Sequence, residues 1–531
     1  MHPTHASHPD NGSRDRTVFG VLFGVYYLLI LYPILRADRY CNDDLIRALL
    51  GNYGWNNNGR PLATLVMRVL ESNSQRIVDI SPLPQIAAIA LLAWIGVLIA
   101  RRFAIRSPAL AVMLALPLGA QPFFLENLAY KFDSVCMALA LLLAVLSILA
   151  NARGARAWWL GTLALLASLT LYQPALNAFL VFAILEAAVS HFERTPVRGI
   201  ALRLGMRAVQ VLVALLVYRW VFAASLQDWV KQHSATVDVF RDGALIVQNA
   251  SAFLRFIADA FTTRALALHG PVLLIVLALP LAMSLRCALT DGRAGRAWRA
   301  IQRLGIGLLL LCMALLGVVG PMLLLADPVM MPRVLPGFGA LLAAALIAAH
   351  VVLRQWPRSE RWQLALGAVL GLGMAAYAAA FGNAAGAQQR YEVAIATQLA
   401  EDLDRLREEG SVQSYVIAGS AGLAPVSAHA ARHFPLIHHL VLSYLREDDF
   451  NTRNFLRHHL ARSEGAPIEA LPAEQAAAVR AQACTVPAHS VRQSYRLQVI
   501  GNTALVTFRN GLAPRCEATE SAPVAYVETL Q

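Results

Sequence analysis

The chain has 531 residues, of which 57% are hydrophobic and 15% are charged, and its formal net charge is +12. A soluble domain contains about 25% charged residues, so this composition excludes an ordinary soluble protein and favours a membrane protein. The arginines lie between long apolar stretches rather than in a basic stripe with interleaved aromatic residues, which argues against a nucleic-acid partner.

The N-terminal segment 1–16 is polar and lacks the small-residue cleavage pattern of a signal peptide. The apolar stretch that follows is therefore expected to remain as a membrane anchor. We predict three parts: a cytoplasmic tail at 1–16, a transmembrane domain at 17–381 and an extracytoplasmic α/β domain at 382–531.

Long apolar stretches dominate the first two-thirds of the chain. A bilayer core about 30 Å thick requires roughly 20 apolar residues per helix, so the predicted fold is mainly α, a polytopic transmembrane helical bundle with eleven spans. The expected spans are 17–35, 83–100, 107–124, 133–150, 157–171, 174–190, 205–223, 268–286, 304–325, 336–353 and 362–381.

The distribution of arginine supports this count, because cytoplasmic loops carry an excess of Arg and Lys. With the N-terminus in the cytoplasm, the loops after the second, fourth, sixth, eighth and tenth spans fall inside, and all are rich in arginine. Pro174 leaves an alternative in which 157–190 is one kinked helix. The alternation of arginine-rich and arginine-poor loops would then fail after Tyr172. The arginine distribution therefore favours eleven spans and places the C-terminal region outside.

The first outside loop is the segment richest in polar side chains, and Asp43 and Asp44 lie just beyond the end of the first span. One interpretation is structural: Asn42 caps a helix, the two aspartates occupy its first turn, and Asp43 pairs with Arg47. The other interpretation is catalytic, because a carboxylate close to a membrane-bound substrate can serve as a general base. The aspartates by themselves leave both interpretations open.

The same loop continues with Trp55, Asn58 and Arg60 in a turn bounded by glycines. Arginine binds phosphate in bidentate geometry, and an aromatic ring with amides suits a sugar, so we interpret this turn as a sugar-phosphate site. The alternative is an interfacial loop with Trp55 in an aromatic belt. Residues 62–70 are expected to lie on the membrane as an amphipathic helix.

Ionisable residues also mark the second outside loop, where Glu126, Lys131 and Asp133 lie at the ends of spans. Such groups are costly at membrane depth and are usually paired or functional. An ion pair between Glu126 and Lys131 is the structural alternative to a functional role. Tyr172 and Gln173 mark the third outside loop.

The fifth outside loop carries a single cation, Arg333, between two prolines that stiffen the loop. A fixed arginine at this position is either a phosphate clamp or an interface anchor.

The region after residue 382 differs in kind from the spans. Residues 386–410 have apolar positions at helical spacing with charges between them, whereas 412–419, 495–501 and 504–509 have the pattern of strands, with a turn signal at Gly501-Asn502. These patterns predict a small α/β domain.

Cys484 and Cys516 are the only cysteines of this region, and an oxidising compartment would let them form a disulfide. Two separate thiols are the alternative. Four histidines there lack a metal-ligand pattern and are expected at the surface: His438, His439, His458 and His459.

The outside loops together resemble a known family. The segment NDDLIRALLGNYGWNNNGRPL resembles the first periplasmic loop of the glucosyltransferase II family, the Gtr-type serotype-converting enzymes of bacterial O-antigen. QPFFLENLAYKFDS resembles the second outside loop of that family, and the YQP turn and the PRVLP loop also fit. The resemblance spans most of the membrane part and is weak over the C-terminal region.

The resemblance implies a GT-C-like fold in the bacterial inner membrane. It also implies transfer of a hexose, expected to be glucose, from a polyprenyl-phosphate donor to an O-antigen-like glycan acceptor outside the cytoplasm. Asp43 and Asp44 would be the catalytic motif, one of them acting as general base. Arg60, Arg333 and Lys131 would bind the donor phosphate. The wider predicted donor site adds Trp55, Asn58, Glu126, Tyr172 and Gln173.

No cofactor is expected. Paired aspartates can hold a divalent metal, but an arginine shell on the phosphate makes one unnecessary. A membrane-embedded donor also explains why the chain has no nucleotide-binding glycine loop.

Other functions remain as alternatives. A flippase or exporter of lipid-linked glycans predicts polar groups along a pathway at mid-span, whereas the polar residues here gather in the outside loops. An O-antigen polymerase and a membrane acyltransferase are further alternatives, although an acyltransferase should show a membrane-embedded histidine and the spans contain few. A scaffold role for residues 382–531 is also open.

Overall fold

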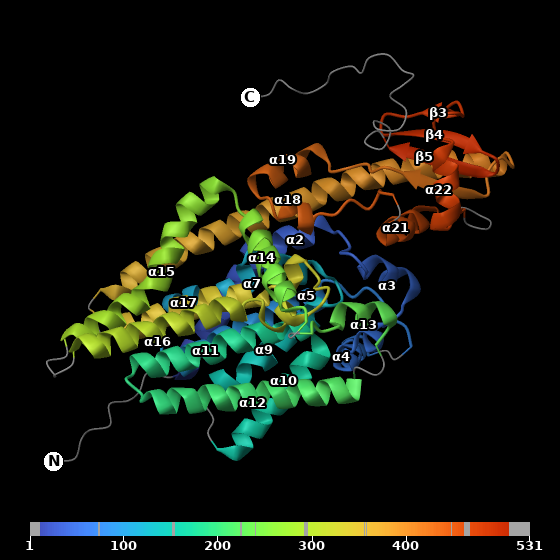
Figure 1. Ribbon diagram of the computed structural model, residues 1–531. Coiled ribbons are helices and arrows are strands. Elements are labelled where there is room, and N and C mark those ends of the chain that lie inside the picture. The colour runs from blue at the N-terminus through green and yellow to red at the C-terminus, as the bar shows by residue number, and fades with distance from the viewer. Residues whose placement is uncertain are drawn as a thin grey trace. The chain divides into compact units, whose positions relative to one another are not determined.

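A computed structural model of the protein describes residues 11–72, 75–150, 154–222, 226–238, 241–290, 296–354, 356, 358–447, 449–460 and 468–508. These residues are mainly helical, with a small sheet near the C-terminus (Figure 1). The chain divides into two compact units, Met1–Asn383 with Ala430–Leu440 and Ala384–His429 with Val441–Gln531.

The first unit is a bundle of long apolar helices with shorter helices in the connections. Its helices are α1 (Asn11–Val25), η1 (Tyr26–Leu31), α2 (Tyr32–Ala37), α3 (Asp44–Leu50), η2 (Trp55–Asn58), α4 (Pro61–Glu71), α5 (Leu83–Arg102), α6 (Pro108–Ala115), α7 (Pro117–Ala120), η3 (Pro122–Phe124), α8 (Leu125–Ala129), α9 (Ser134–Leu149), α10 (Ala155–Leu171), η4 (Gln173–Ala175), α11 (Leu176–Phe192), α12 (Val197–Phe222), α13 (Asp228–Ser234), α14 (Gly243–Asp259), α15 (Thr263–Thr290), α16 (Arg296–Gly317), η6 (Gly320–Leu324), η7 (Pro332–Val334), α17 (Pro336–Leu353), α20 (Ile437–Leu440) and the first part of α18 (Ser359–Glu408).

The bundle is held together by apolar helix pairs. Helix α9 packs against α5 and α10, α11 packs against α16 and α17, and α15 packs against α16. Glycines allow the closest approaches: a Cβ on Gly337 would lie 2.4 Å from the carbonyl oxygen of Val318, and one on Gly339 would lie 2.6 Å from that of Pro117. Small residues at such crossings let helix backbones approach each other in a membrane environment.

The bundle has two chemically different ends. Asn177 donates to the carbonyl oxygen of Val334 where α11 and α17 begin, and Glu193 pairs with Arg354 where they finish, so these two helices run in parallel. We call the first end, where α2 finishes and α11 and α17 begin, the loop end. We call the other the arginine end, defined by three ion pairs: Arg101–Asp15, Arg207–Glu186 and Arg354–Glu193.

Each of the eleven predicted spans overlaps helix in the structure. Within the described residues, eight helices are long and apolar enough to cross a membrane, or up to nine if a bent pair counts as one span. Helices α9 and α10 are apolar but have 16 and 17 residues. The number of crossings therefore stays a prediction.

Two expected spans are interrupted. The one at 107–124 bends by 54° between Pro108–Ala120 and Pro122–Ala129, where Gln121 is extended and its side chain accepts a hydrogen bond from the Phe123 N–H. The one at 304–325 ends as an α-helix at Gly317. Proline at the start of a short helix is expected, because its missing N–H has no intrahelical partner there.

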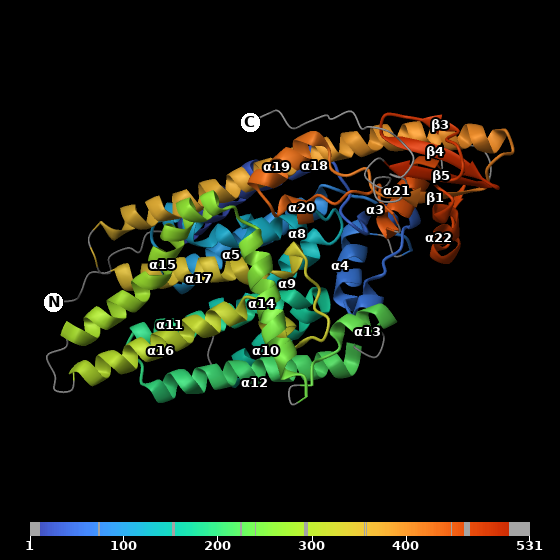
Figure 2. The same cartoon turned by 45° about the horizontal axis from the view of Figure 1, so that its top comes forward.

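The connection between α12 and α15 contains two helices, α13 and α14, that were not predicted. Gln227 at the start of α13 donates its N–H to the carbonyl oxygen of Asn57, 3.1 Å away, and both views show α13 beside α4 (Figure 2). Asn249 of α14 donates to the carbonyl oxygens of Leu323 and Leu325. These contacts fasten the connection to the loop end of the bundle.

The second unit contains the C-terminal part of α18, α19 (Pro425–His433, up to His429), α21 (Phe450–Leu460), α22 (Ala473–Ala481) and a five-stranded sheet. Its strands are β1 (Ser414–Ala418), β2 (Glu469–Ala470), β3 (Ser490–Val491), β4 (Tyr495–Ile500) and β5 (Thr503–Phe508), in the order β2-β1-β5-β4-β3.

The sheet is mixed: β1 is parallel to β2 and β5, whereas β4 is antiparallel to β3 and β5. The predicted helix and three strands are confirmed, with Gly501 and Asn502 forming the turn between β4 and β5. The two-residue strands β2 and β3 were not predicted.

Two expectations for the second unit have different outcomes. His459 was expected at the surface but is buried, with its ring edge-on to Phe455; the surface prediction is wrong for it because it lies on the inner face of α21. Cys484 is disulfide-bonded. Its predicted partner, Cys516, lies outside the described residues, so the pairing stays a prediction.

Candidate active site

The loop after the first long helix forms the centre of the site. Asp38 ends α2 in a left-handed conformation, with φ 44°, and Asn42 also has a positive φ of 47°. Asp43 is the N-cap residue of α3, without a side-chain cap hydrogen bond. The expectation that Asn42 caps this helix is therefore wrong: its side-chain amide donates instead to Glu126 (3.1 Å) and to the Tyr130 hydroxyl (2.9 Å).

Arg47, one turn into α3, is the most enclosed cation of the site. Its Nη2 donates to Asp43 Oδ2 at 2.6 Å, which confirms the predicted pair, and its Nε lies 3.7 Å from Asp133 Oδ2. The guanidinium stacks on Trp55, 4.2 Å from the ring centroid, and Nη1 donates to the carbonyl oxygen of Tyr53. Burial by itself lowers the pKa of Arg47, but the surrounding aspartates outweigh it and raise that pKa.

Asp43 and Asp44 occupy different environments although they are neighbours. The Asp43 side chain is 42% exposed, whereas Asp44 is completely buried. Asp44 Oδ2 accepts from the backbone N–H of Lys131 (2.7 Å) and of Cys41 (3.3 Å), and its Oδ1 has no hydrogen-bond partner in the described structure. Burial, followed by the charges of Asp43 and Asp133, raises the pKa of Asp44 well above its usual range.

Asp133 joins the second outside loop to the first. Its Oδ1 accepts a hydrogen bond from the indole N–H of Trp55 at 2.6 Å, and its Oδ2 faces Arg47. Trp55 is fully buried, so it offers no exposed face to a sugar and instead supports Arg47 and Asp133.

Glu126 and Arg333 form a buried pair that links the second and fifth outside loops. The Glu126 carboxylate accepts both the Arg333 backbone N–H (2.9 Å) and a guanidinium N–H (2.5 Å). The carbonyl oxygen of Arg333 in turn accepts from the Tyr172 hydroxyl at 2.7 Å and from Asn127 at 3.3 Å. Burial opposes the charged form of Arg333, but Tyr130 and Glu126 raise its pKa above the usual range.

Lys131 lies in a separate cluster next to Asp44. Its Nζ is 2.6 Å from Asp38 Oδ1 and 3.6 Å from Asp79 Oδ2, and it lies over the ring of Tyr40. The alternative of a Glu126–Lys131 ion pair is therefore wrong, because Glu126 is taken by Arg333 and Lys131 by two aspartates.

Arg60 differs from the other three cations because it forms no ion pair in the described part of the chain. Its Nε donates to the Gln173 side-chain oxygen at 2.8 Å, and its guanidinium lies 4.9 Å from the Tyr172 ring centroid. Gln173 also donates to the carbonyl oxygen of Asn58 (3.1 Å) and to the Tyr218 hydroxyl (2.7 Å). The charge of Arg60 is therefore not cancelled by a contacting carboxylate.

The family model for the glucosyl transferase GtrII matches residues 32–344, which is more than half of the chain and includes every element of the site. The chain belongs to the GtrII glucosyltransferase family. The resemblance read from the outside loops is thereby confirmed, and the protein is a member of a glycosyltransferase family.

One similar protein from Salmonella phage P22 is described as an uncharacterized 55.3 kDa protein in the gtrB 5' region. It is 24% identical over 447 residues, which cover 82% of this chain and 88% of that protein. No solved structure matches the chain.

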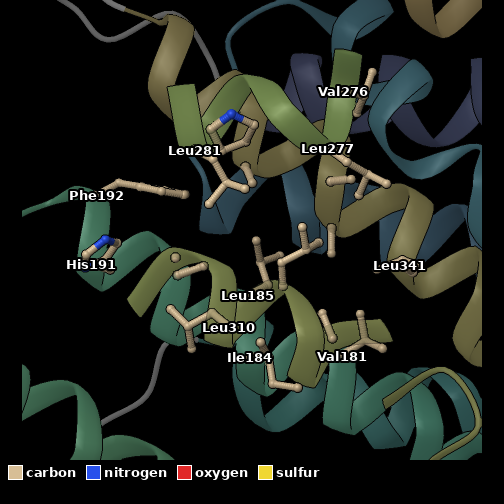
Figure 3. Close-up of a pocket in the computed structure, with 18 residues that line it drawn as sticks. Val181, Ile184, Leu185, His191, Phe192, Val276, Leu277, Leu281, Leu310 and Leu341 are labelled. Carbon is tan, nitrogen blue, oxygen red and sulfur yellow. The ribbon is translucent and has the colours of Figure 1, made fainter. Parts of the chain in front are cut away.

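The candidate site of this GtrII-family protein does not coincide with an apolar cavity in the described part of the chain. That cavity lies among α11, α15, α16 and α17 and is lined by apolar side chains and His191 (Figure 3). None of the predicted site residues lines it. Within the described residues, no group of three or more His, Cys, Asp and Glu side chains is arranged to hold a metal ion.

The structure brings the predicted site residues of this family member into two connected groups. In the first group Asp43 and Trp55 contact Arg47, and Glu126 pairs with Arg333. In the second group Arg60 and Asn58 contact Gln173, and Arg60 lies over Tyr172. Asp44 instead accepts from the backbone of Lys131, whose side chain pairs with Asp38 and Asp79. Tyr172 connects the two groups through the carbonyl oxygen of Arg333.

Several residues of the site were not predicted as part of it. Arg47 was predicted only as the helix partner of Asp43, and Asp133 only as an ionisable residue at the end of a span. The available signal for Asp133 was its place at the end of the second loop motif, QPFFLENLAYKFDS. Asp38, Asp79 and Tyr218 had no signal, because each reaches the site from an element whose place depends on the tertiary fold.

Proposed function

We propose that this protein transfers glucose from a polyprenyl-phosphate donor to a lipid-linked O-antigen or other envelope glycan, at the periplasmic face of the bacterial inner membrane. Membership of the family supplies the sugar transfer; the donor, the acceptor and the face of the membrane are our proposals. The observation that carries them is a set of polar loops, at the end of helices long enough to cross a membrane, that holds a partly exposed carboxylate, Asp43, and a cation without a carboxylate partner in the described residues, Arg60.

Asp43 is the better base of the two neighbouring aspartates. A general base must come within hydrogen-bond reach of the hydroxyl that it deprotonates, and the Asp43 side chain is partly exposed with one oxygen held by Arg47. Asp44 is enclosed, and its raised pKa favours the protonated form. We therefore assign the base to Asp43 and a supporting role to Asp44.

Arg60 is the best candidate for the donor phosphate. As the bond to the sugar breaks, the phosphate gains negative charge, which a fixed guanidinium stabilises. Arg333 contributes as a second donor, because Glu126 engages its backbone N–H and one guanidinium nitrogen and leaves the rest of the guanidinium for a ligand. Lys131 is less suited, because Asp38 and Asp79 already surround it.

The acceptor and donor meet in a single displacement. The acceptor O–H proton passes to Asp43, the acceptor oxygen bonds to the anomeric carbon of the sugar, and the bond from that carbon to the phosphate oxygen breaks. The arginine bias of the other end supports an outward-facing loop end. This chemistry needs no metal in our proposal, and unchanged transfer after chelation of divalent ions would support that part.

The test is mass spectrometry of envelope polysaccharide from cells that lack the protein or produce the wild type, Asp43→Asn or Asp44→Asn at matched membrane levels. Asp15→Asn at the arginine end is the control, because Asp15 also pairs with arginines, Arg14 and Arg101, but lies away from the site. We expect a hexose-sized mass increment with the wild type, Asp44→Asn and Asp15→Asn, and its loss with Asp43→Asn.

An increment that persists in Asp43→Asn would overturn the assignment of the base. A wild-type protein that adds no hexose, but whose removal blocks export of the glycan, would favour the flippase or exporter alternative.

A further inference from the structure

Arg47 lies between two carboxylates, Asp43 and Asp133, and is too enclosed to contact a substrate directly. Only 7% of the residue is exposed, and its contacts are Asp43, Asp133, Trp55 and a backbone carbonyl. We propose that Arg47 is a positioning residue that holds the Asp43 base in its reactive orientation. This inference rests on the proposed function.

The contact with Arg47 fixes one carboxylate oxygen of Asp43 and leaves the other oxygen available to a substrate. Oδ2 lies 2.6 Å from Arg47 Nη2, and Oδ1 has no hydrogen-bond partner among the described residues. A carboxylate held in this way presents its second oxygen to an incoming hydroxyl. Because the Asp43 side chain is 42% exposed, it would otherwise sample several rotamers in water.

Arg47 can serve this purpose because it is itself immobile. Asp133 faces its Nε, the Trp55 ring covers one side of the guanidinium, and Tyr53 O accepts from Nη1. Asp133 is held in turn by the Trp55 indole N–H. An exposed ion pair at i,i+4 contributes little to helix stability. The contacts of Arg47 with Asp133, Trp55 and Tyr53 therefore go beyond what such a pair needs.

The reaction step explains what the arrangement achieves. The acceptor O–H bond breaks and its proton moves to Asp43 Oδ1, while the acceptor oxygen bonds to the anomeric carbon and the electron pair of the breaking bond leaves with the phosphate. Oδ2 stays bonded to Arg47 throughout, so the carboxyl group keeps its place when it becomes neutral. Asp133 still faces the Arg47 guanidinium at that moment, so Arg47 keeps one carboxylate partner when Asp43 becomes neutral.

The test uses the full-length protein in lipid nanodiscs, with a glucosyl phosphoryl polyprenol as donor and lipid-linked envelope glycan as acceptor. The variants are Arg47→Gln, Arg47→Lys, Asp43→Asn and Asp43→Asn with Arg47→Gln. Arg207→Gln is the matched control, because Arg207 forms a half-buried pair with Glu186 at 2.9 Å at the arginine end.

We expect Arg47→Gln to lower kcat by about 100-fold, the scale of a small misplacement of a reacting group, and to leave the donor KM unchanged. Arg47→Lys should recover part of kcat, because an ammonium group can still pair with Asp43. The double variant should be no slower than Asp43→Asn alone, because Arg47 acts through Asp43. Arg207→Gln should leave kcat unchanged.

Arg47→Gln also leaves Asp133 buried without its cation, and this variant can fail to fold. Arg47→Gln combined with Asp133→Asn removes both charges, and the same fall in kcat is expected from that folded variant. This keeps the measurement independent of the stability of the single variant.

Three results would overturn the inference: a kcat of Arg47→Gln close to that of Arg207→Gln, a tenfold or larger rise in donor KM, or losses that multiply in the double variant. The second and third would make Arg47 a substrate contact. Failure of the proposed function is a separate outcome, seen as no sugar transfer by the wild-type protein. Full activity of Asp43→Asn would instead overturn the assignment of the base, and this inference with it.

Discussion

The loop end and the arginine end of the same helix bundle treat charge in opposite ways. At the arginine end, each carboxylate pairs with one or two arginines, and the Arg354–Glu193 side chains are 45% and 51% exposed. At the loop end, carboxylates gather around fewer cations, and Asp44, Glu126 and Asp133 are buried. A chain of net charge +12 thus concentrates acidic groups at one place.

This contrast separates charges with a structural explanation from charges that need another one. Exposed pairs contribute about 0–1 kcal/mol, and positive charge at one end of a membrane bundle is a topology signal. Buried carboxylates are costly unless they are paired, and perturbed pKa values cluster at functional sites. The loop end, and not the apolar cavity, is therefore where chemistry is expected.

The largest effect should come from removing the base. Asp43→Asn should lower kcat by about 100- to 10,000-fold, the usual contribution of general acid–base catalysis, whereas Asp15→Asn at the arginine end should keep kcat near that of the wild type. Initial rates of sugar transfer by the purified proteins measure both. Equal losses in the two variants would erase the contrast between the ends.

Removing the arginine of an ion pair should lower the stability of the protein more at the loop end than at the arginine end. Arg333→Met leaves the Glu126 side chain, which is 3% exposed, without its cation and should cost about 3–5 kcal/mol. Arg354→Met should cost about 1 kcal/mol or less, because that pair is exposed. Thermal unfolding in detergent gives the comparison, and Arg333→Met with Glu126→Gln should recover much of the lost stability.

A smaller effect is expected from Arg60, since it acts on substrate through charge. Arg60→Gln should raise the donor KM and lower kcat/KM by about 10- to 100-fold, the effect of losing 1.4–3 kcal/mol from a charge-assisted hydrogen bond. Arg60→Lys should retain part of the affinity. Steady-state kinetics with varied donor would show an unchanged KM if the phosphate is bound elsewhere.

The smallest effect is a pH dependence at Asp44. Burial raises the pKa of Asp44 above its value in the unfolded chain, so the folded state binds more protons and loses stability as pH rises from about 4 through the raised pKa. Asp44→Asn lacks this group and should therefore gain stability relative to the wild type as pH rises. Melting temperatures at pH 5, 7 and 9 measure the difference; a constant difference would mean that Asp44 is ionised at all three.

The sequence predicted the helices and the motif loops but only part of the site. Apolar length located the long helices, and turn chemistry at Gly501-Asn502 located the hairpin of the sheet. The pairing of Glu126 with Arg333 was out of reach, because their positions are set by a bend in one span and a loop before another.

The cap interpretation failed for a related reason. Asn42 has the composition of a helix cap, but its amide is taken by Glu126 and Tyr130, which lie far along the chain. Local rules assume local partners. The burial that distinguishes Asp44 from Asp43 likewise comes from the tertiary fold, because the backbone of Lys131 covers Asp44.

The two glycines near the start of α17 have a consequence for reading mutational screens. A side chain at Gly337 or Gly339 would push against the backbone at Val318 or Pro117, and the displaced helix begins three residues after Arg333. Such variants would lose transfer while the chemical groups of the site stay intact. A screen scored by activity alone would list both glycines beside the catalytic residues, and a separate measurement of folded protein in the membrane would be needed to remove them.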